Sequence, residues 1–199
     1  MSMRIVLLAC LTGLALGPAA VAQEVVRYKS AVVALTDDPA LRAEFEDNLA
    51  AKFRDHNYDA VPSYDIVSEV TRLDDSSFVR RLADRGVQAV LMLRPAAIGP
   101  GSTLESVQAE VSPEIYRDMS AFAKQVGSTG GEELVAVIHM AVYTIVERRA
   151  ELVSAGAVWL DEEVESREQG IERLQDLIVR NLDEARPMLR QRLGLAPLL

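Results

Sequence analysis

The residues best suited to do chemistry gather around two histidines. His56 stands in the run Asp55-His56-Asn57-Tyr58-Asp59, where an imidazole and two carboxylates could supply a general base or hold a metal. We interpret this run as the polar end of a helix, because such clusters commonly stop a helix and turn the chain. His139 lies among apolar residues with no second ligand at a suitable spacing, which predicts a core or half-buried histidine.

Two serines stand in glycine-containing loops. Ser102 follows Gly99-Pro100-Gly101 and Ser128 precedes Thr129-Gly130-Gly131, but neither lies in the Gly-x-Ser-x-Gly pattern that exposes a nucleophile. Neither loop continues into the Gly-Lys-Ser/Thr of a phosphate-binding loop. We interpret both as hinges, and a hydrolase that uses His56 or Ser102 is the least favoured of three functional hypotheses.

Acidic runs precede two of the predicted helices. Asp74-Asp75 and Asp161-Glu162-Glu163 are placed where negative charge favours the positive end of a helix dipole. The alternating oxygen ligands of a calcium loop are absent from both runs. The sequence therefore predicts no catalytic residue, no cofactor and no metal.

Aromatic side chains are the remaining candidates for a binding site. Tyr64, Tyr116, Phe122 and Trp159 are the predicted contacts for a partner or a ligand. Trp159 would anchor a partner if it pointed outward, as exposed aromatic residues often do. Its apolar neighbours and the alternation of side chains along a strand favour the core instead.

The amino terminus has the pattern of a cleavable secretory signal. Arg4 precedes an apolar run from Ile5 to Leu16, and Ala20-Val21-Ala22 supplies small residues before Gln23. The apolar run is shorter than the roughly 20 residues that a membrane-spanning helix needs. We therefore predict cleavage after Ala22 and a periplasmic or secreted protein of residues 23–199.

Cys10 offers an alternative end to the signal. Leu7-Leu8-Ala9-Cys10 matches the box at which lipoprotein signals are cut and lipidated, but few residues precede it and apolar sequence continues after it. Cleavage after Ala22 would remove the only cysteine of the chain, leaving no disulfide and no thiol nucleophile.

Charge restricts the partners. The chain carries a net charge of −9, which becomes −10 after cleavage because Arg4 is the only charge removed. A chain of this charge without a basic stripe repels phosphate backbones, so nucleic acid and anionic membrane surfaces are not expected partners. With the export signal, the expected partner is another envelope protein, and the oligomeric state is open.

The patterning predicts an α/β domain with one mixed sheet of about five strands. The expected order is β-α-β-α-β, a helical insertion over residues 95–132, and then β-β-α. The expected elements are strands at 25–35, 58–67, 87–93, 134–146 and 151–160, and helices at 39–54, about 75–86, within the insertion, and after 163. A charged turn from Glu147 to Ala150 joins the last two strands, and Pro187 should kink or restart the final helix.

Four stretches of this chain resemble one family of envelope domains. They are Ala43 to Phe53, Ala60-Val61-Pro62-Ser63-Tyr64, Gly86 to Leu91, and Val135 to Tyr143 with Leu152-Val153. In these stretches the chain resembles periplasmic lipoprotein-type domains related to the curli-secretion pore lipoprotein, the lipoprotein activator of a peptidoglycan synthase, and the amino-terminal domain of the Tol translocation protein. Relatives commonly place a tryptophan directly after the Leu-Val pair, whereas Ser154 follows here.

The resemblance implies a scaffold or regulator of an envelope assembly without catalytic residues. Our first functional hypothesis is therefore a non-enzymatic accessory protein that binds through its sheet edge or through the insertion. The alternative is a small-ligand binding domain whose cleft lies between the sheet and the insertion helix, near Tyr64, Tyr116 and Trp159.

Overall fold

The computed structural model describes residues 28–67, 75–97, 114–124, 135–160 and 165–194. The predicted signal with Cys10, the acidic residues Asp74 and 161–163, Ser102, Ser128 and most of the 95–132 insertion lie outside these ranges. Of the insertion, the structure describes the end of one strand and residues 114–124.

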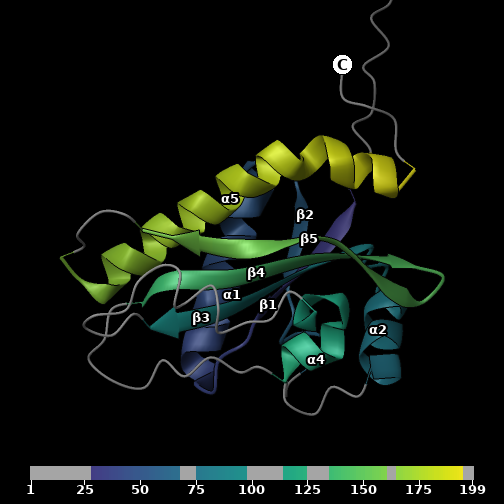
Figure 1. Ribbon diagram of the computed structural model, residues 1–199, viewed down its shortest axis with the longest axis horizontal. Coiled ribbons are helices and arrows are strands. Elements are labelled where there is room, and N and C mark those ends of the chain that lie inside the picture. Colours follow the sequence, from purple (N-terminus) through teal and green to yellow (C-terminus); the bar gives the residue numbers. More distant parts are fainter. Residues whose placement is uncertain (1–27, 68–74, 98–113, 125–134, 161–164, 195–199) are drawn as a thin grey trace, which may run out of the picture.

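One mixed sheet of five strands forms the centre of the protein (Figure 1). The strands lie in the order β2-β1-β3-β4-β5, and β1 pairs in parallel with β2 and β3. β4 runs antiparallel to both β3 and β5. The strands are β1 (Lys29–Ala34), β2 (Asp59–Pro62), β3 (Ala89–Ala97), β4 (Val135–Val146) and β5 (Arg149–Trp159). The predicted α/β class with a mixed five-stranded sheet is confirmed.

Helices cover both faces of the sheet. On one face lie α1 (Pro39–Asp55) and α5 (Arg167–Arg192). On the other lie α2 (Asp75–Asp84), the short 3-10 helix η2 (Ile115–Arg117) and α4 (Met119–Ala123). Side chains alternate along β1, so that Val32 faces α1 and α5 while Val33 faces α2 and α4.

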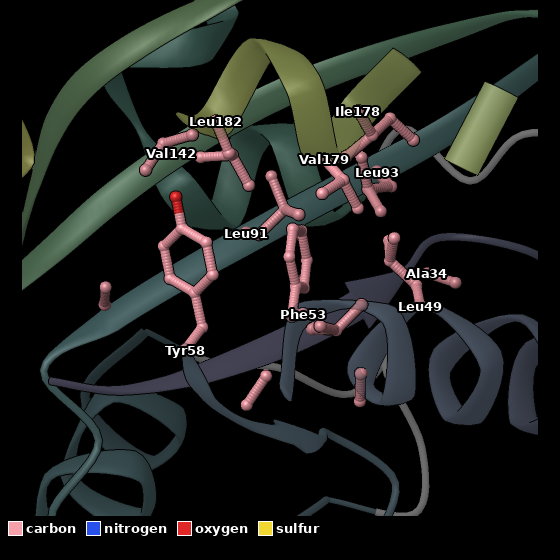
Figure 2. Close-up of a cluster of buried hydrophobic side chains, with 14 of the residues drawn as sticks. Ala34, Leu49, Phe53, Tyr58, Leu91, Leu93, Val142, Ile178, Val179 and Leu182 are labelled. Carbon is pink, nitrogen blue, oxygen red and sulfur yellow. The ribbon is translucent and has the colours of Figure 1, made fainter. Parts of the chain in front are cut away.

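The larger core lies between the sheet and the helices α1 and α5. Figure 2 shows the Phe53 ring rising from α1 toward Leu91 of β3 and Val179 of α5. Phe53 is 2% exposed and its ring lies 5.4 Å from that of Tyr58, edge to face. The four-residue spacing of Leu41, Phe45, Leu49 and Phe53 therefore marks the face of α1 that turns to the sheet, with Leu41 at its partly exposed end.

The boundaries of α1 follow the chemistry of its end residues. Asp38 Oδ1 accepts hydrogen bonds from Ala40 N at 2.9 Å and Leu41 N at 3.1 Å, and Pro39 begins the helix. At the other end His56 is the C-cap and Asn57 has a φ of 64°. The interpretation of the His56 run as a helix end is confirmed.

The hairpin between β4 and β5 turns more tightly than the sequence predicts. Val146 pairs with Arg149, and the two residues between them have φ angles of 49° at Glu147 and 62° at Arg148. Two left-handed residues fit the twist of the flanking strands, so the strand begins at Arg149. The expected four-residue turn is therefore wrong. Further along, Val142 pairs with Ser154 and Tyr143 with Leu152, which makes Val153 a bulge.

Two helix predictions need comment. α5 continues through Pro187 to Arg192, so the expectation of a restart is wrong, and Figure 1 shows a helix that bends. The predicted insertion helix is divided by Asp118, whose side chain accepts from Ser120 N and caps α4. Met119, Phe122 and Ala123 are buried and Ile115 packs against them, so the two short helices share one apolar face.

Candidate protein-binding surface

The two edges of the sheet are built differently. β2 forms one edge with four residues and ends at Pro62, which has no N–H to donate. β5 forms the other edge with eleven residues, and the nine from Leu152 to Leu160 carry no charge. No strand of the described ranges pairs with the outer side of β5. Its backbone can therefore accept a further strand.

Trp159 stands at the carboxyl end of this edge. Its side chain is 39% exposed, although its cross-strand partner Val137 on β4 is fully buried. The interpretation of Trp159 as a core residue is therefore wrong. Alternation alone cannot show whether a strand has a neighbour on one side or on two, and a residue at the edge loses the cover that a second neighbour would give.

Two of the four predicted contact residues belong to the core. Phe122 is 0% exposed and Tyr116 is 8% exposed, and their rings lie 5.0 Å apart. The Tyr116 hydroxyl lies 2.9 Å from His139 Nδ1, and Tyr143 donates to the Tyr116 carbonyl at 2.7 Å. Burial raises the pKa of the Tyr116 hydroxyl, against a smaller opposite effect of Arg94. His139, 1% exposed, is the core histidine that the sequence predicts.

Tyr64 lies far from Trp159. It follows β2, whereas Trp159 ends β5, so four strand spacings of about 4.8 Å, or about 19 Å, separate the two edges. The Tyr64 hydroxyl donates to Asp47 Oδ1 at 2.6 Å, and this hydrogen bond raises its pKa to about 12. The fold thus brings Tyr116 and Phe122 together and places Tyr64 and Trp159 at opposite edges.

A buried ion pair fixes the carboxyl end of β2. Glu46 is 0% exposed and Arg42 is 5% exposed, and Arg42 Nε donates to Glu46 Oε1 at 2.9 Å. Glu46 also accepts from Ser63 N at 2.6 Å and from Ala34 N at 2.9 Å. Arg42 Nη2 donates to the Val67 carbonyl at 3.0 Å. With both partners satisfied in this way, the pair is a structural clasp.

A second polar network holds the amino end of β2. Tyr58 donates to Asp183 Oδ1 at 2.9 Å and accepts from Arg186 Nε at 2.9 Å, and His56 Nδ1 lies 2.8 Å from Asp183 Oδ2. Burial acts to raise the pKa of the Asp183 carboxyl, but its contacts with His56, Tyr58 and Arg186 outweigh this and hold the pKa below its usual value.

The second network limits the chemistry open to His56. A carboxylate on Nδ1 is the arrangement that orients a histidine base. The hydroxyl beside it, that of Tyr58, is no nucleophile at neutral pH, because burial raises its pKa and keeps it protonated. Ser102, the other residue of the hydrolase hypothesis, lies outside the described residues. Within the described ranges no group of three acidic, histidine or cysteine residues could hold a metal ion.

Both networks left only weak signals in the amino-acid sequence. Arg42 and Glu46 stand four residues apart on α1, a spacing that predicts an ion pair but not its burial. They lie on the side of the helix that also carries Phe45 and Leu49. Asp183 and Arg186 flank the apolar row of α5. Their meeting with His56, 127 residues away from Asp183, depends on the packing of α5 against α1.

None of the described helices is long and apolar enough to cross a membrane. No family model matches the chain, and no curated protein matches it. Among solved structures, phosphoribosylglycinamide formyltransferase from Brucella melitensis is similar with a TM-score of 0.26 and 11% identity, over 87% of this chain and 99% of that chain. At this TM-score the likeness bears on neither fold nor function.

Proposed function

We propose that this chain is a non-enzymatic, exported accessory or scaffold protein of a cell-envelope assembly, which binds a partner by adding a strand to β5. The observation that carries the proposal is the uncharged edge from Leu152 to Leu160, with Trp159 exposed at its end. The signal pattern before Gln23 and the resemblance to envelope scaffold domains support the location and the role.

Strand addition fits this edge physically. An edge strand presents alternate N–H and C=O groups that are free to pair, and natural proteins usually blunt such edges with charge, proline or short length. β5 has no charge and no proline from Leu152 to its end at Trp159, and it is eleven residues long. In strand addition the backbone hydrogen bonds supply affinity and side-chain contacts supply specificity. Trp159 would supply such a contact, because large aromatic residues dominate the energy of interfaces.

The test is a site-specific photo-crosslink in the native envelope. A crosslinking residue at Ala155, exposed on β5, should capture a discrete partner, whereas the same residue at Asp65, exposed beside the opposite edge, should not. Crosslinks of equal pattern at both positions, or none at Ala155, would refute binding through β5.

An edge-blocking variant extends the test. Ala155→Lys with Gly156→Lys places a charge on each face of the edge, and a Cβ added at Gly156 meets no atom within 4 Å. The Ala155 crosslink is then repeated from the neighbouring Ala157 in this variant and in the control Ala155→Ser with Gly156→Ala. The adduct should persist in the control and disappear in the lysine variant. Mass spectrometry of the native protein should also find Gln23 at its amino terminus rather than a lipidated Cys10.

One observation favours the alternative of small-ligand binding. Arg94 lies on β3 just past Leu93, the last residue that pairs with β1. The connection from β1 runs to β2 on one side of β1 and the next connection returns to β3 on its other side, and such a reversal is where open α/β sheets bind ligands. The Arg94 Nε and Nη1 atoms are buried and donate no hydrogen bond to the described residues. A small carboxylate or phosphate ligand should raise the melting temperature of the protein, and Arg94→Gln should abolish the rise. A flat response to both classes of anion would remove this alternative.

A further inference from the structure

An open cleft separates the first half of α1 from the first half of α5. It has a volume of about 670 Å³ and an apolar floor of Leu41, Phe45 and Ile171. Carboxylates stand on both of its walls, Glu44 on α1 and Glu168 and Glu172 on α5. The cleft therefore combines an apolar base with an anionic rim.

The rim carboxylates are not explained by the fold. Glu44, Glu168 and Glu172 form no ion pair within the described residues, and the cleft's lysine, Lys52, is paired with Asp176 instead. The helix dipole favours Glu168 in the first turn of α5 but does not reach Glu172. Glu168 and Glu172 stand four residues apart on one helix, and like charges at that spacing destabilise it. A cation brought from outside the chain would relieve this repulsion.

The tip of the β4–β5 hairpin has the complementary chemistry. Val146 is 38% exposed, and the exposed residues Glu147, Arg148 and Arg149 follow it, so the turn carries two cationic side chains and one carboxylate. The Arg148 side chain is 66% exposed, and its salt bridge to Asp84 is an exposed one that contributes little to stability. Apolar and cationic groups are thus presented together at one projecting turn.

The turn holds these side chains in a conformation that costs energy. Glu147 and Arg148 both have left-handed φ angles, which Asn-Gly or Asp-Gly would adopt far more easily. A strained position whose sequence does not serve the fold suggests that its side chains serve a function. Arg148 occupies such a position.

The tip and the cleft lie at opposite ends of the sheet. Near the tip Thr144 pairs with Ala89, the first residue of β3, whereas α1 begins beyond the last residue of β1, a strand parallel to β3. Figure 1 shows the hairpin turn and the start of α5 on opposite sides of the molecule. One chain cannot place its own tip in its own cleft.

We infer that the hairpin tip of one copy docks into the α1–α5 cleft of a second copy. Val146 covers the apolar floor while Arg148 and Arg149 face the rim carboxylates. Such a contact joins two different surfaces, so it repeats head to tail and builds rings or filaments. This inference is independent of partner binding through β5, because neither the tip nor the cleft includes residues 152–160.

The test uses two charge-reversed variants of the full chain. Glu168→Lys with Glu172→Lys blocks the cleft, and Arg148→Glu with Arg149→Glu blocks the tip. In sedimentation velocity the unaltered protein should associate with rising concentration, and more weakly as salt is added. Each variant alone should associate about tenfold more weakly or not at all.

Mixing the two variants gives the decisive result. The cleft-blocked copy keeps an intact tip and the tip-blocked copy keeps an intact cleft, and the reversed tip and reversed cleft are again opposite in charge. A 1:1 mixture should therefore recover the association that each variant alone has lost. A control with Asp65→Lys and Glu184→Lys changes the net charge as the cleft variant does, but at exposed sites outside the cleft, and should associate like the unaltered protein.

Each other outcome overturns the inference. The first is an unaltered protein that remains monomeric at all concentrations. The second is association of both variants to the same extent as the unaltered protein. The third is a mixture that stays monomeric although each variant keeps its melting temperature. If a reversal lowers the melting temperature, the milder pairs Glu168→Gln with Glu172→Gln and Arg148→Gln with Arg149→Gln take its place. The edge variant Ala155→Lys with Gly156→Lys should still associate, which separates this contact from binding at β5.

Discussion

The two edge strands of the sheet differ in how they are held in place. The short edge strand β2 is held at its carboxyl end by Glu46 and Arg42, and at its amino end by Tyr58, Asp183 and Arg186. The long edge strand β5 has no comparable charged clasp among the described residues, and no strand of the described ranges pairs with its outer side. Charged networks therefore hold one edge strand in place, and the other edge is the one that we propose as the binding site.

The largest effect should come from removing the buried carboxylate. Glu46→Ala leaves Arg42 as an uncompensated buried charge and strands the N–H groups of Ala34 and Ser63, so it should lower the free energy of unfolding by about 3 to 5 kcal/mol. Urea denaturation measures the change. Glu44→Ala, exposed on the same helix, is the control and should stay within about 0.5 kcal/mol. Equal losses in the two variants would show that Glu46 is no clasp.

A smaller effect is expected at the other end of β2. Asp183→Asn weakens the contacts with His56, Tyr58 and Arg186 and should cost about 1 kcal/mol, since the side chain is partly exposed to solvent. Folding lowers the pKa of the Asp183 carboxyl below its value of about 3.9 in the unfolded chain, so the ionised carboxylate stabilises the protein above pH 3.9 or so. This contribution is lost as the pH falls through the lower pKa of the folded state. The free energy of unfolding should therefore fall less steeply with decreasing pH in Asp183→Asn than in the unaltered protein. An identical fall in both proteins would contradict a stabilising role of the Asp183 charge.

Trp159 should matter less for folding than for binding. Trp159→Ala removes a side chain that is 39% exposed, so the free energy of unfolding should fall by about 1 kcal/mol or less. Trp159 is the only tryptophan of the chain, so its fluorescence reports on this site alone. The emission should be quenched readily by acrylamide and protected when a partner strand covers β5. A decrease in the free energy of unfolding above about 3 kcal/mol is typical of a buried aromatic residue and would show that Trp159 is part of the core.

The smallest effect on stability should occur at the open edge itself. Ala155→Lys with Gly156→Lys should change the free energy of unfolding by no more than about 0.5 kcal/mol, because both positions are exposed. The same pair of changes should abolish the crosslink at β5. A large loss of stability would mean that the edge is covered, and the contrast between the two edges would disappear.

Local signals in the sequence were sufficient for most of the elements. Asp38 and Pro39 marked the start of α1, and the four-residue spacing from Leu41 to Phe53 marked its packed face, because capping and periodicity are properties of neighbouring residues. The uninterrupted apolar run at Val32 to Leu35 is likewise typical of a strand buried on both faces, and β1 has helices on both of its faces.

The features that depend on strand order could not be obtained in this way. Trp159 is exposed because β5 has a single neighbour, and no residue near Trp159 encodes that fact. The clasp around Glu46 joins α1 to Ser63, which lies 17 residues further along the chain, and only the parallel pairing of β1 and β2 brings them together. The tight turn at Glu147 and Arg148 was missed because neither residue type is typical of left-handed positions.

The bulge at Val153 decides which way the end of β5 faces. The bulge interrupts the regular alternation of side chains between the two faces of the sheet. Leu152 and Ala155 therefore both lie on the face covered by α2 and α4, although they are three residues apart. Deleting Val153 alone would remove the bulge and leave Trp159 opposite Val137 on its present face. A strand that kept Val153 but ran without a bulge would instead turn Trp159 to the side of α5 and swap the environments of every residue from Val153 to the strand's end. The bulge at Val153 therefore determines which side chains of β5 face α5 and which face α2 and α4.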